Sequence, residues 1–276
     1  MNAIEVHGLH KTYDGRAVVA GIDLTVAQGE VFALLGPNGA GKTTTIEILE
    51  GHRPRDGGAV SVLGRDPGQA DRWWRSRVGI VLQQIGDAGD LTVGESVRQF
   101  TRFYPDPADP DELLELCGLT AQRSARVATL SGGQRRRLDV ALGLVGNPEL
   151  LFLDEPTTGF DPEARRQFWG VIRTLASRGL TVVLTTHYLE EAEVLADRLA
   201  VLVAGRIVAE GTPGTLGGRD RELALVTWND ASGEHRVRTP DPSRELGALA
   251  GAEVTDLRVS RPSLEEIYLD LIGARP

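Results

Sequence analysis

The chain has 276 residues, of which 41% are hydrophobic, 25% charged and 5% aromatic. This composition is typical of globular proteins and excludes disordered and fibrous classes. The 39 acidic residues outnumber the 30 basic ones and give a formal net charge of −9, so we expect no nucleic-acid partner. The single cysteine, Cys117, excludes an intrachain disulfide and a cysteine-based metal cluster.

No apolar run approaches the roughly 18–20 residues that a membrane-spanning helix needs. The N-terminus alternates apolar and polar residues and lacks the basic segment and apolar core of a signal peptide. If the protein acts at a membrane, we expect another chain to span it.

The predicted elements begin with strands and continue with helices. Short runs rich in β-branched residues predict strands at 22–26, 31–35, 59–63 and 78–82. Helical periodicity follows over about 92–146, where Asp109 and Pro110 read as an N-cap and the first helical residue. We expect Trp73 and Trp74 to pack in the core, with a docking surface as the alternative.

Strands and helices then alternate: strands at 150–153, 180–186 and 199–203 flank helices that begin near 162 and 188. This order predicts a mostly parallel sheet in an α/β domain. Glu190, Glu191 and Glu193 do not predict a metal site, because the first two occupy adjacent positions that face different ways on a helix.

A Gly-rich stretch at 211–218 predicts a domain boundary. Beyond it, strands near 223–228, 235–238 and 254–259 precede a helix that opens with a capping box of Ser263 and Glu266. We therefore expect an α/β domain over residues 1–216, with a helical subdomain at about 92–146, and a small α+β accessory domain over residues 217–276.

Residues 36–43 read Gly-Pro-Asn-Gly-Ala-Gly-Lys-Thr directly after an apolar strand, and they match the phosphate-loop pattern G-x-x-x-x-G-K-[ST] in its strand-to-helix context. Backbone N–H groups of such a loop surround phosphates, and the following helix directs its positive end toward them. The predicted nucleotide-binding residues are Gly36, Pro37, Asn38, Gly39, Ala40, Gly41, Lys42, Thr43 and Thr44.

Only two of the 30 basic residues are lysines, Lys11 and Lys42. Lys42 is the lysine of the phosphate loop, where a compact ammonium fits and a planar guanidinium would crowd the backbone. We expect its ammonium to reach the β- and γ-phosphates, and the Thr43 hydroxyl to bind Mg²⁺. No pattern explains Lys11.

A second motif is the apolar run 150–153 that ends in Asp154 and Glu155. Downstream of a phosphate loop, it predicts a Walker B strand, with Asp154 holding Mg²⁺ and Glu155 polarising the attacking water.

Between these two motifs lies the sequence Leu-Ser-Gly-Gly-Gln, in which Ser131, Gly132, Gly133 and Gln134 precede a predicted helix. It resembles the signature sequence of ATP-binding cassette (ABC) ATPases. The resemblance covers about residues 3–215 and implies the P-loop cassette fold, with an antiparallel β subdomain and a helical subdomain. It also implies a head-to-tail dimer in which each signature closes over ATP held by the other copy.

The resemblance assigns roles to four further residues. Tyr13 is similar to the aromatic that stacks on adenine, although a simple strand tyrosine is the alternative. Gln83, or Gln84 if the register shifts by one, resembles the glutamine that touches Mg²⁺ and water and senses the membrane subunit. His187 resembles the switch histidine that contacts the γ-phosphate.

Asp161 corresponds to the aspartate of the loop that crosses the dimer, and it also reads as a helix cap, so both roles can hold. Phe160 departs from the leucine usual before that aspartate.

The single cassette and the tail that begins at Ser263 resemble drug-exporter ATPases of the daunorubicin-resistance type. The resemblance implies ATP and Mg²⁺ as cofactors, a separate integral membrane permease subunit, a second ATPase copy, and a place at the cytoplasmic face of the cell membrane. An importer ATPase and a non-transport ABC ATPase are the alternatives.

Overall fold

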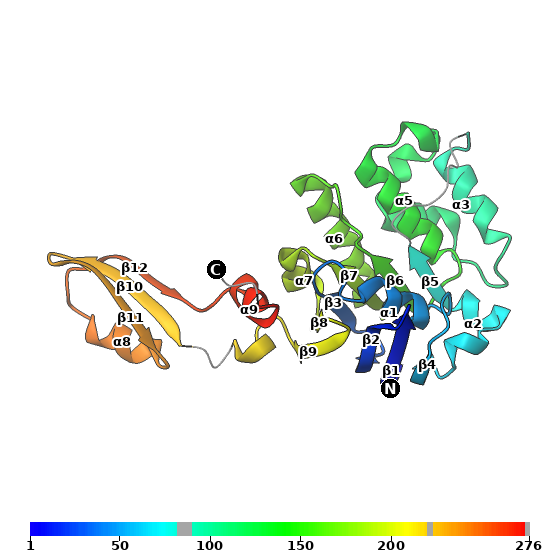
Figure 1. Cartoon of the computed structure of the whole chain (residues 1–276). Coiled ribbons are helices and arrows are strands. Elements are labelled where there is room, and N and C mark those ends of the chain that lie inside the picture. Colours follow the sequence, from blue (N-terminus) through cyan, green and yellow to red (C-terminus); the bar gives the residue numbers. More distant parts are fainter. Residues whose placement is uncertain (82–89, 220–222, 274–276) are drawn as a thin grey trace.

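The structure is a computed structural model that describes residues 1–81, 90–219 and 223–273. Three sheets organise these residues: a six-stranded sheet in the order β5-β6-β7-β3-β8-β9, and two three-stranded sheets in the orders β2-β1-β4 and β11-β10-β12. Figure 1 shows the first two sheets packed together with most of the helices, and the third sheet apart from them.

The six-stranded sheet forms the centre of the α/β domain. Its strands are β3 (Val31–Leu35), β5 (Val78–Val81), β6 (Leu150–Asp154), β7 (Thr181–Thr186), β8 (Arg198–Val203) and β9 (Arg206–Gly211). Neighbouring strands are parallel except β9, which runs antiparallel to β8. The predicted α/β class and mostly parallel sheet are confirmed.

Both faces of this sheet are buried, as its nearly continuous apolar strands require. In β3, the odd-numbered residues join one apolar cluster, while Phe32 and Leu34 join the other. This division follows from the alternation of side chains along a strand.

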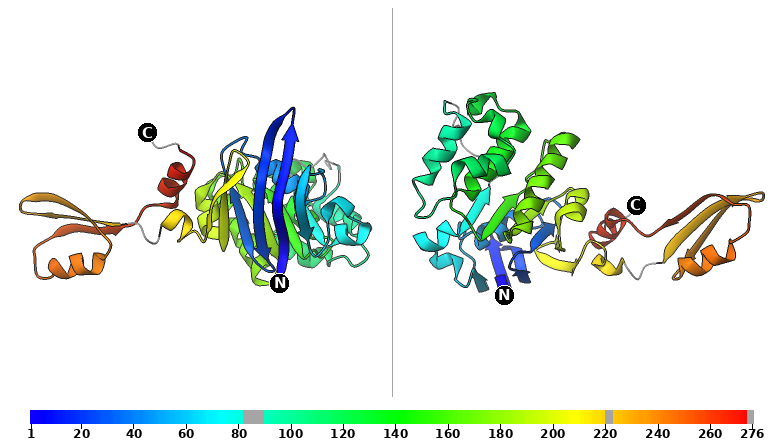
Figure 2. Two further views of the ribbon diagram at one scale, coloured as in Figure 1. Left: turned by 60° about the horizontal axis from the view of Figure 1, so that its bottom comes forward. Right: turned by 180° about the vertical axis from the view of Figure 1, so that it is seen from behind.

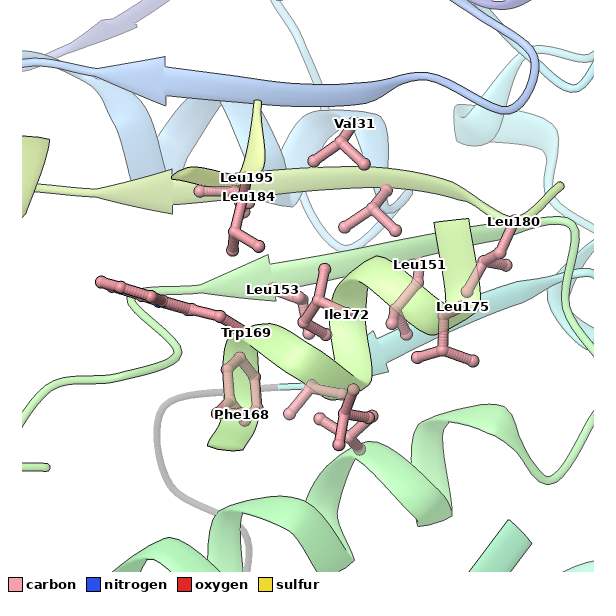
Figure 3. Packing of buried hydrophobic residues seen from close by; sticks show 14 of the residues in the cluster. Val31, Leu151, Leu153, Phe168, Trp169, Ile172, Leu175, Leu180, Leu184 and Leu195 are labelled. Atoms are coloured by element: carbon pink, nitrogen blue, oxygen red, sulfur yellow. The ribbon is translucent and has the colours of Figure 1, made fainter. Parts of the chain in front are cut away.

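One face of the sheet is covered by the helices α5 (Gly132–Leu144), α6 (Pro162–Ser177) and α7 (Leu189–Leu195). Figure 3 shows Phe168 and Ile172 of α6 packed beneath Leu153 and Leu184 of the strands. This packing fixes α6 and α7 beside the strands that carry the Walker B and His187 positions.

The other face is covered by the antiparallel sheet of β1 (Asn2–Tyr13), β2 (Arg16–Ala27) and β4 (Gly57–Val62), together with α1 (Lys42–Leu49). The left view of Figure 2 shows the long hairpin of β1 and β2 lying across this side of the molecule.

The segment at 92–146 holds α3 (Val93–Thr101), α4 (Pro110–Leu116) and α5. The predicted cap of α4 is confirmed, because the Asp109 carboxylate accepts hydrogen bonds from the N–H groups of Asp111 and Glu112. Short 3₁₀ turns lie at Pro67–Gln69, Thr120–Gln122, Val127–Thr129 and Leu216–Gly218.

The two tryptophans of α2 (Arg72–Ser76) have different environments. Trp74 is buried and its indole N–H donates to the Val62 carbonyl at 2.8 Å. Trp73 is 54% exposed, with the guanidinium groups of Arg65 and Arg77 5.0 and 4.4 Å from its ring centroid. The expectation of a core position was therefore wrong for Trp73, because adjacent helical residues point in different directions.

The C-terminal part consists of β10 (Ala224–Asp230), β11 (Gly233–Thr239), α8 (Pro242–Ala248), β12 (Thr255–Ser260) and α9 (Leu264–Leu271). The capping box of Ser263 and Glu266 at the start of α9 is confirmed. Leu264 and Ile267 of α9 pack in the same apolar cluster as Leu216, so this last helix returns to the α/β domain. The division into domains at residue 216 stays a prediction.

Within the described ranges, no helix combines the length and the apolar character needed to cross a bilayer.

Phe168 provides a test of the packing in Figure 3, because it is completely buried. We predict that Phe168→Ala lowers the free energy of unfolding by about 3–5 kcal/mol through lost burial and a residual cavity. Phe103→Ala is the matched control, since Phe103 is 62% exposed, and it should change this free energy by less than about 0.5 kcal/mol. Urea denaturation measures both, and equal losses would contradict the assigned packing.

Candidate functional site

The register of the central sheet brings three of the predicted site residues to one edge. In the β6-β7-β3 part of the sheet, Asp154 pairs with Thr185 and Leu35 pairs with Thr186. The next residues on these three parallel strands are Glu155, His187 and Gly36, so all three leave the sheet at its carboxyl edge. Ligands of open α/β sheets bind at this edge.

The phosphate loop leaves β3 and leads directly into α1. A Cβ atom at Gly36 would lie 2.3 Å from the Leu202 carbonyl oxygen, and one at Gly41 would lie 2.5 Å from the Val18 carbonyl oxygen. Gly41 also has φ of +106°, in the region that favours glycine. The backbones of β8 and β2 therefore require glycine at both positions.

The rest of the loop is partly open to solvent. Asn38, Gly39 and Thr43 are exposed, Pro37 and Thr44 are half-buried, and Ala40 is buried. Gly41 is the N-cap of α1 and contributes no side-chain cap, which suits a helix N-terminus that receives an anion.

Lys42 lies inside this loop. Its ammonium donates to the Gly36 carbonyl at 2.7 Å and to the Pro37 carbonyl at 3.3 Å. Burial lowers the pKa of Lys42, while Glu155 and Asp154 oppose this shift. The negative charges of Glu155 and Asp154 therefore act on the Lys42 ammonium.

Thr185 of β7 holds the two carboxylate residues at the end of β6. Its hydroxyl donates to Asp154 Oδ1, and the Glu155 N–H is directed toward the Thr185 carbonyl and hydroxyl oxygens at 3.1 Å each. Glu155 has φ of +44°, an uncommon conformation for a residue with a Cβ, so the chain turns sharply directly after the strand.

His187 and Glu155, two of the predicted catalytic residues, lie in contact. His187 Nδ1 is 3.4 Å from Glu155 Oε2, and the His187 ring centroid is 4.1 Å from that of Tyr188. The Thr158 hydroxyl lies 3.4 Å from the same Glu155 oxygen. A carboxylate and an imidazole therefore share the edge of the sheet with the phosphate loop.

The signature residues begin α5 as a capping box. The Gln134 N–H donates to Ser131 Oγ at 3.3 Å, and the Ser131 N–H donates to Gln134 Oε1 at 3.0 Å. A Cβ atom at Gly132 would meet nothing within 4 Å, whereas one at Gly133 would lie 3.0 Å from Ala164 Cβ. Gly132 therefore leaves open space in front of the helix.

The signature and Asp161 line one shallow cavity of about 170 Å³, together with Arg137, Glu163, Ala164 and Gln167. None of the phosphate-loop residues lines it. The Asp161 carboxylate accepts from the Ala164 N–H at 2.8 Å and caps α6, so the predicted capping role is confirmed.

Tyr13 lies at the end of β1 among cationic side chains. Its hydroxyl accepts from Arg53 Nη1 at 2.6 Å, and Lys11 Nζ is 5.4 Å from its ring centroid. Lys11 also forms a 2.8 Å ion pair with Asp56. The structure thus gives Lys11 local partners that sequence alone did not suggest. Gln83 and Gln84 lie outside the described residues.

Sequence reasoning missed Arg136. From α5, its guanidinium donates to the carbonyls of Asp154 at 3.0 Å and Pro156 at 3.1 Å. Its side chain is buried, and burial lowers its pKa against the attraction of Asp139 and Asp154. Residues 135–137 are all arginine, so the sequence does not indicate that Arg136 is the one that bonds the signature helix to the Walker B turn.

The oxygen ligands at this edge fit Mg²⁺. This ion is usually bound by one or two carboxylates together with substrate phosphates and water, and Asp154 and Thr43 supply a carboxylate and a hydroxyl. Within the described ranges, no group of three His, Cys, Asp or Glu side chains is placed to hold a metal ion.

Comparisons with known proteins agree with this geometry. The ABC transporter family profile matches residues 19–158. The Nod factor export ATP-binding protein I of Rhizobium johnstonii is 41% identical over 98% of this chain and 95% of that protein. The daunorubicin/doxorubicin resistance ATP-binding protein DrrA of Streptomyces peucetius is 39% identical over 98% of this chain and 92% of that protein.

Solved structures give the same result. The structure of an ATP-binding subunit of an ABC transporter is similar with a TM-score of 0.71 and 25% identity, over 98% of this chain and 99% of that chain. An ATP-binding cassette of an ABC transporter in its ADP conformation has a TM-score of 0.69 and 23% identity, over 77% of this chain and 91% of that chain, which supports the fold alone. The chain therefore belongs to the ABC transporter family, as a subunit that binds and hydrolyses ATP.

Proposed function

We propose that this chain powers export of a drug, antibiotic or lipid-like substrate through a separate permease subunit at the cytoplasmic face of the membrane. The named functions of the relatives support export, since one is a Nod factor export protein and another a daunorubicin/doxorubicin resistance protein. The observation that carries the catalytic part is the contact of Glu155 and His187 at the sheet edge that also holds Lys42.

In this proposal, the loop N–H groups and Lys42 bind the phosphates, and Tyr13 stacks on the adenine. Glu155 accepts a proton from the attacking water, and His187 contacts the γ-phosphate. Thr43, Asp154 and Gln83 would hold Mg²⁺, which neutralises phosphate charge when bound. The fixed positions of Lys42, Glu155 and His187 would lower the barrier because these groups are oriented before the reaction.

A second copy of the chain completes each site. The cavity lined by the signature and Asp161 excludes the phosphate loop of the same chain, which supports a signature that acts on ATP bound by the other copy. Ser131, Gly133 and Gln134 line that cavity at the N-terminus of α5, and such a helix end attracts anions. The functional unit is therefore a head-to-tail dimer.

The permease subunit is proposed to dock beside the helical segment. A cavity of about 500 Å³ lies there and is lined in part by Phe100 and Tyr104. Phe100 and the neighbouring Phe103 are exposed, with ring centroids 6.1 Å apart. Exposed apolar side chains gathered at one place favour contact with another protein.

Lys42 tests the phosphate loop. We predict that Lys42→Ala weakens ATP binding by at least about 100-fold, and that Lys42→Arg also fails to bind, because the guanidinium does not fit between the loop carbonyls. Equilibrium binding of a fluorescent ATP analogue measures this. Arg236→Ala is the control and should remain within about threefold of the wild type, because Arg236 is an exposed cation of β11 whose partner is Glu234. Undiminished binding by Lys42→Ala would refute the assignment.

Glu155 tests the reaction. We predict that Glu155→Gln binds ATP with unchanged affinity and forms a stable ATP-bound dimer, while its turnover falls by about 100- to 1,000-fold, because the amide cannot accept the proton of water. Phosphate release and light scattering measure the two effects. Wild-type turnover would remove Glu155 as the general base.

Mixing two inactive variants tests the dimer. Gly132→Asp places a carboxylate in open space and should block the signature by charge repulsion without disturbing the fold. A mixture of this variant with Lys42→Ala should regain ATP hydrolysis, because each mixed dimer contains one intact loop facing one intact signature. A mixture that stays inactive although mixed dimers form would contradict the head-to-tail arrangement.

A further inference from the structure

Glu191 is a fully buried carboxylic acid that the proposed catalytic roles leave unused. It lies in the first turn of α7, and its exposed fraction is 0%. Burial of a carboxylate is costly unless hydrogen bonds compensate for the lost water. Its neighbours therefore indicate why this position carries a carboxyl group.

Side chains from three segments surround this carboxyl group. The Trp169 indole N–H donates to Glu191 Oε1 at 3.2 Å. Burial raises the pKa of Glu191, while the Thr186 hydroxyl, the Trp169 indole, the Thr157 hydroxyl and the charge of Arg165 oppose the rise. In Figure 3, Trp169 lies toward the carboxyl ends of the strands, away from Leu175 and Leu180.

The contact with Thr157 is incomplete. Within the described part of the chain, Glu191 Oε2 and Thr157 Oγ1 are both buried without a hydrogen bond of normal geometry. Each of these two buried oxygens therefore lacks the hydrogen bond that would compensate for its burial. A buried pair of this kind makes the position of the turn at Thr157 dependent on Glu191.

The neighbours of Glu191 belong to the segments that carry the proposed catalytic groups. Thr157 is two residues after Glu155, and Thr186 directly precedes His187. Trp169 belongs to α6, the helix capped by Asp161. One buried carboxyl group thus accepts a hydrogen bond from α6 and interacts with a threonine of each of the other two segments.

A second set of contacts connects the same segments nearer the surface. The Arg165 guanidinium of α6 lies 4.5 Å from the Tyr188 ring centroid, and the Tyr188 ring is 4.1 Å from the His187 ring. Arg165 is also 3.7 Å from the exposed carboxylate of Glu190. The helix α6 therefore supports His187 through Tyr188 as well as through Glu191.

We propose that Glu191 is a positioning residue for ATP hydrolysis. It holds the Thr157 turn and the end of β7 in place, so that Glu155 and His187 are directed at the same phosphate. This inference rests on the proposed roles of Glu155 and His187. Displacement of a reacting group by about 1 Å costs on the order of 100-fold in rate. Since the neighbours of Glu191 do not include the phosphate loop, its loss should lower kcat and leave ATP binding unchanged.

Two substitutions at this position distinguish the effect of its polar contacts on kcat from the effect of its side-chain volume. Glu191→Leu has a similar volume and no polar atoms, and we expect its kcat to fall by about 10- to 100-fold, with KM and ATP affinity within about twofold of the wild type. Glu191→Gln keeps an acceptor for Trp169 and gains a donor toward Thr157, so its kcat should stay within about threefold. Glu193→Leu is the matched control on the same helix, because its exposed side chain pairs with Arg219, outside the three segments, and it should hydrolyse ATP at the wild-type rate.

Thr157→Val keeps the inference testable if Glu191→Leu does not fold. It removes one hydroxyl, retains the branched shape, and should lower kcat without changing KM. Wild-type kcat in a folded Glu191→Leu protein, or in Thr157→Val, would overturn the inference, and so would a loss of ATP affinity parallel to the loss of kcat. Full turnover by Glu155→Gln would instead refute the proposed function itself.

Discussion

The parallel register of β6, β7 and β3 is the constraint on which the site depends. Hydrogen bonding pairs Asp154 with Thr185 and Leu35 with Thr186, so the three strands end together, and the phosphate loop, the Walker B carboxylates and His187 leave the sheet side by side. The strands keep this register because both faces of the sheet are buried in apolar clusters, and a slip would expose those side chains or bury polar ones.

The elements that cover the two faces of this sheet also shape the site. The backbones of β2 and β8 approach the phosphate loop so closely that only glycine fits at Gly36 and Gly41. On the opposite face, α5 reaches the Walker B turn through Arg136, and the buried Glu191 of α7 interacts with Thr157 of the same turn. The segment that carries the signature is therefore connected by hydrogen bonds to the segment that carries Glu155. Such a connection provides a physical route by which closure over ATP could affect the catalytic turn, because a bonded side chain must follow its partners.

Sequence alone predicted the parts of the protein that local patterns encode. The boundaries of β3 and β6, the caps Asp109 and Asp161, and the capping box at Ser263 depend on neighbours within a few residues. The short helix α8 was not predicted; it has no buried residues and so little apolar periodicity to detect. The role of Glu191 was also hidden, because its neighbours Thr157 and Trp169 are distant in sequence. The different environments of Trp73 and Trp74 likewise depend on how α2 meets the antiparallel sheet.

The central claim is that ATP binds at the carboxyl edge of the sheet and that a second copy of the chain completes this binding site. A structure of the Glu155→Gln variant crystallised with ATP and Mg²⁺ tests this claim most directly. The account predicts two ATP molecules in a head-to-tail dimer, each with its γ-phosphate beside Lys42 and His187 of one copy and against the signature residues of the other. ATP bound by the phosphate loop with no contact from a second signature, or with His187 directed away from the γ-phosphate, would contradict it.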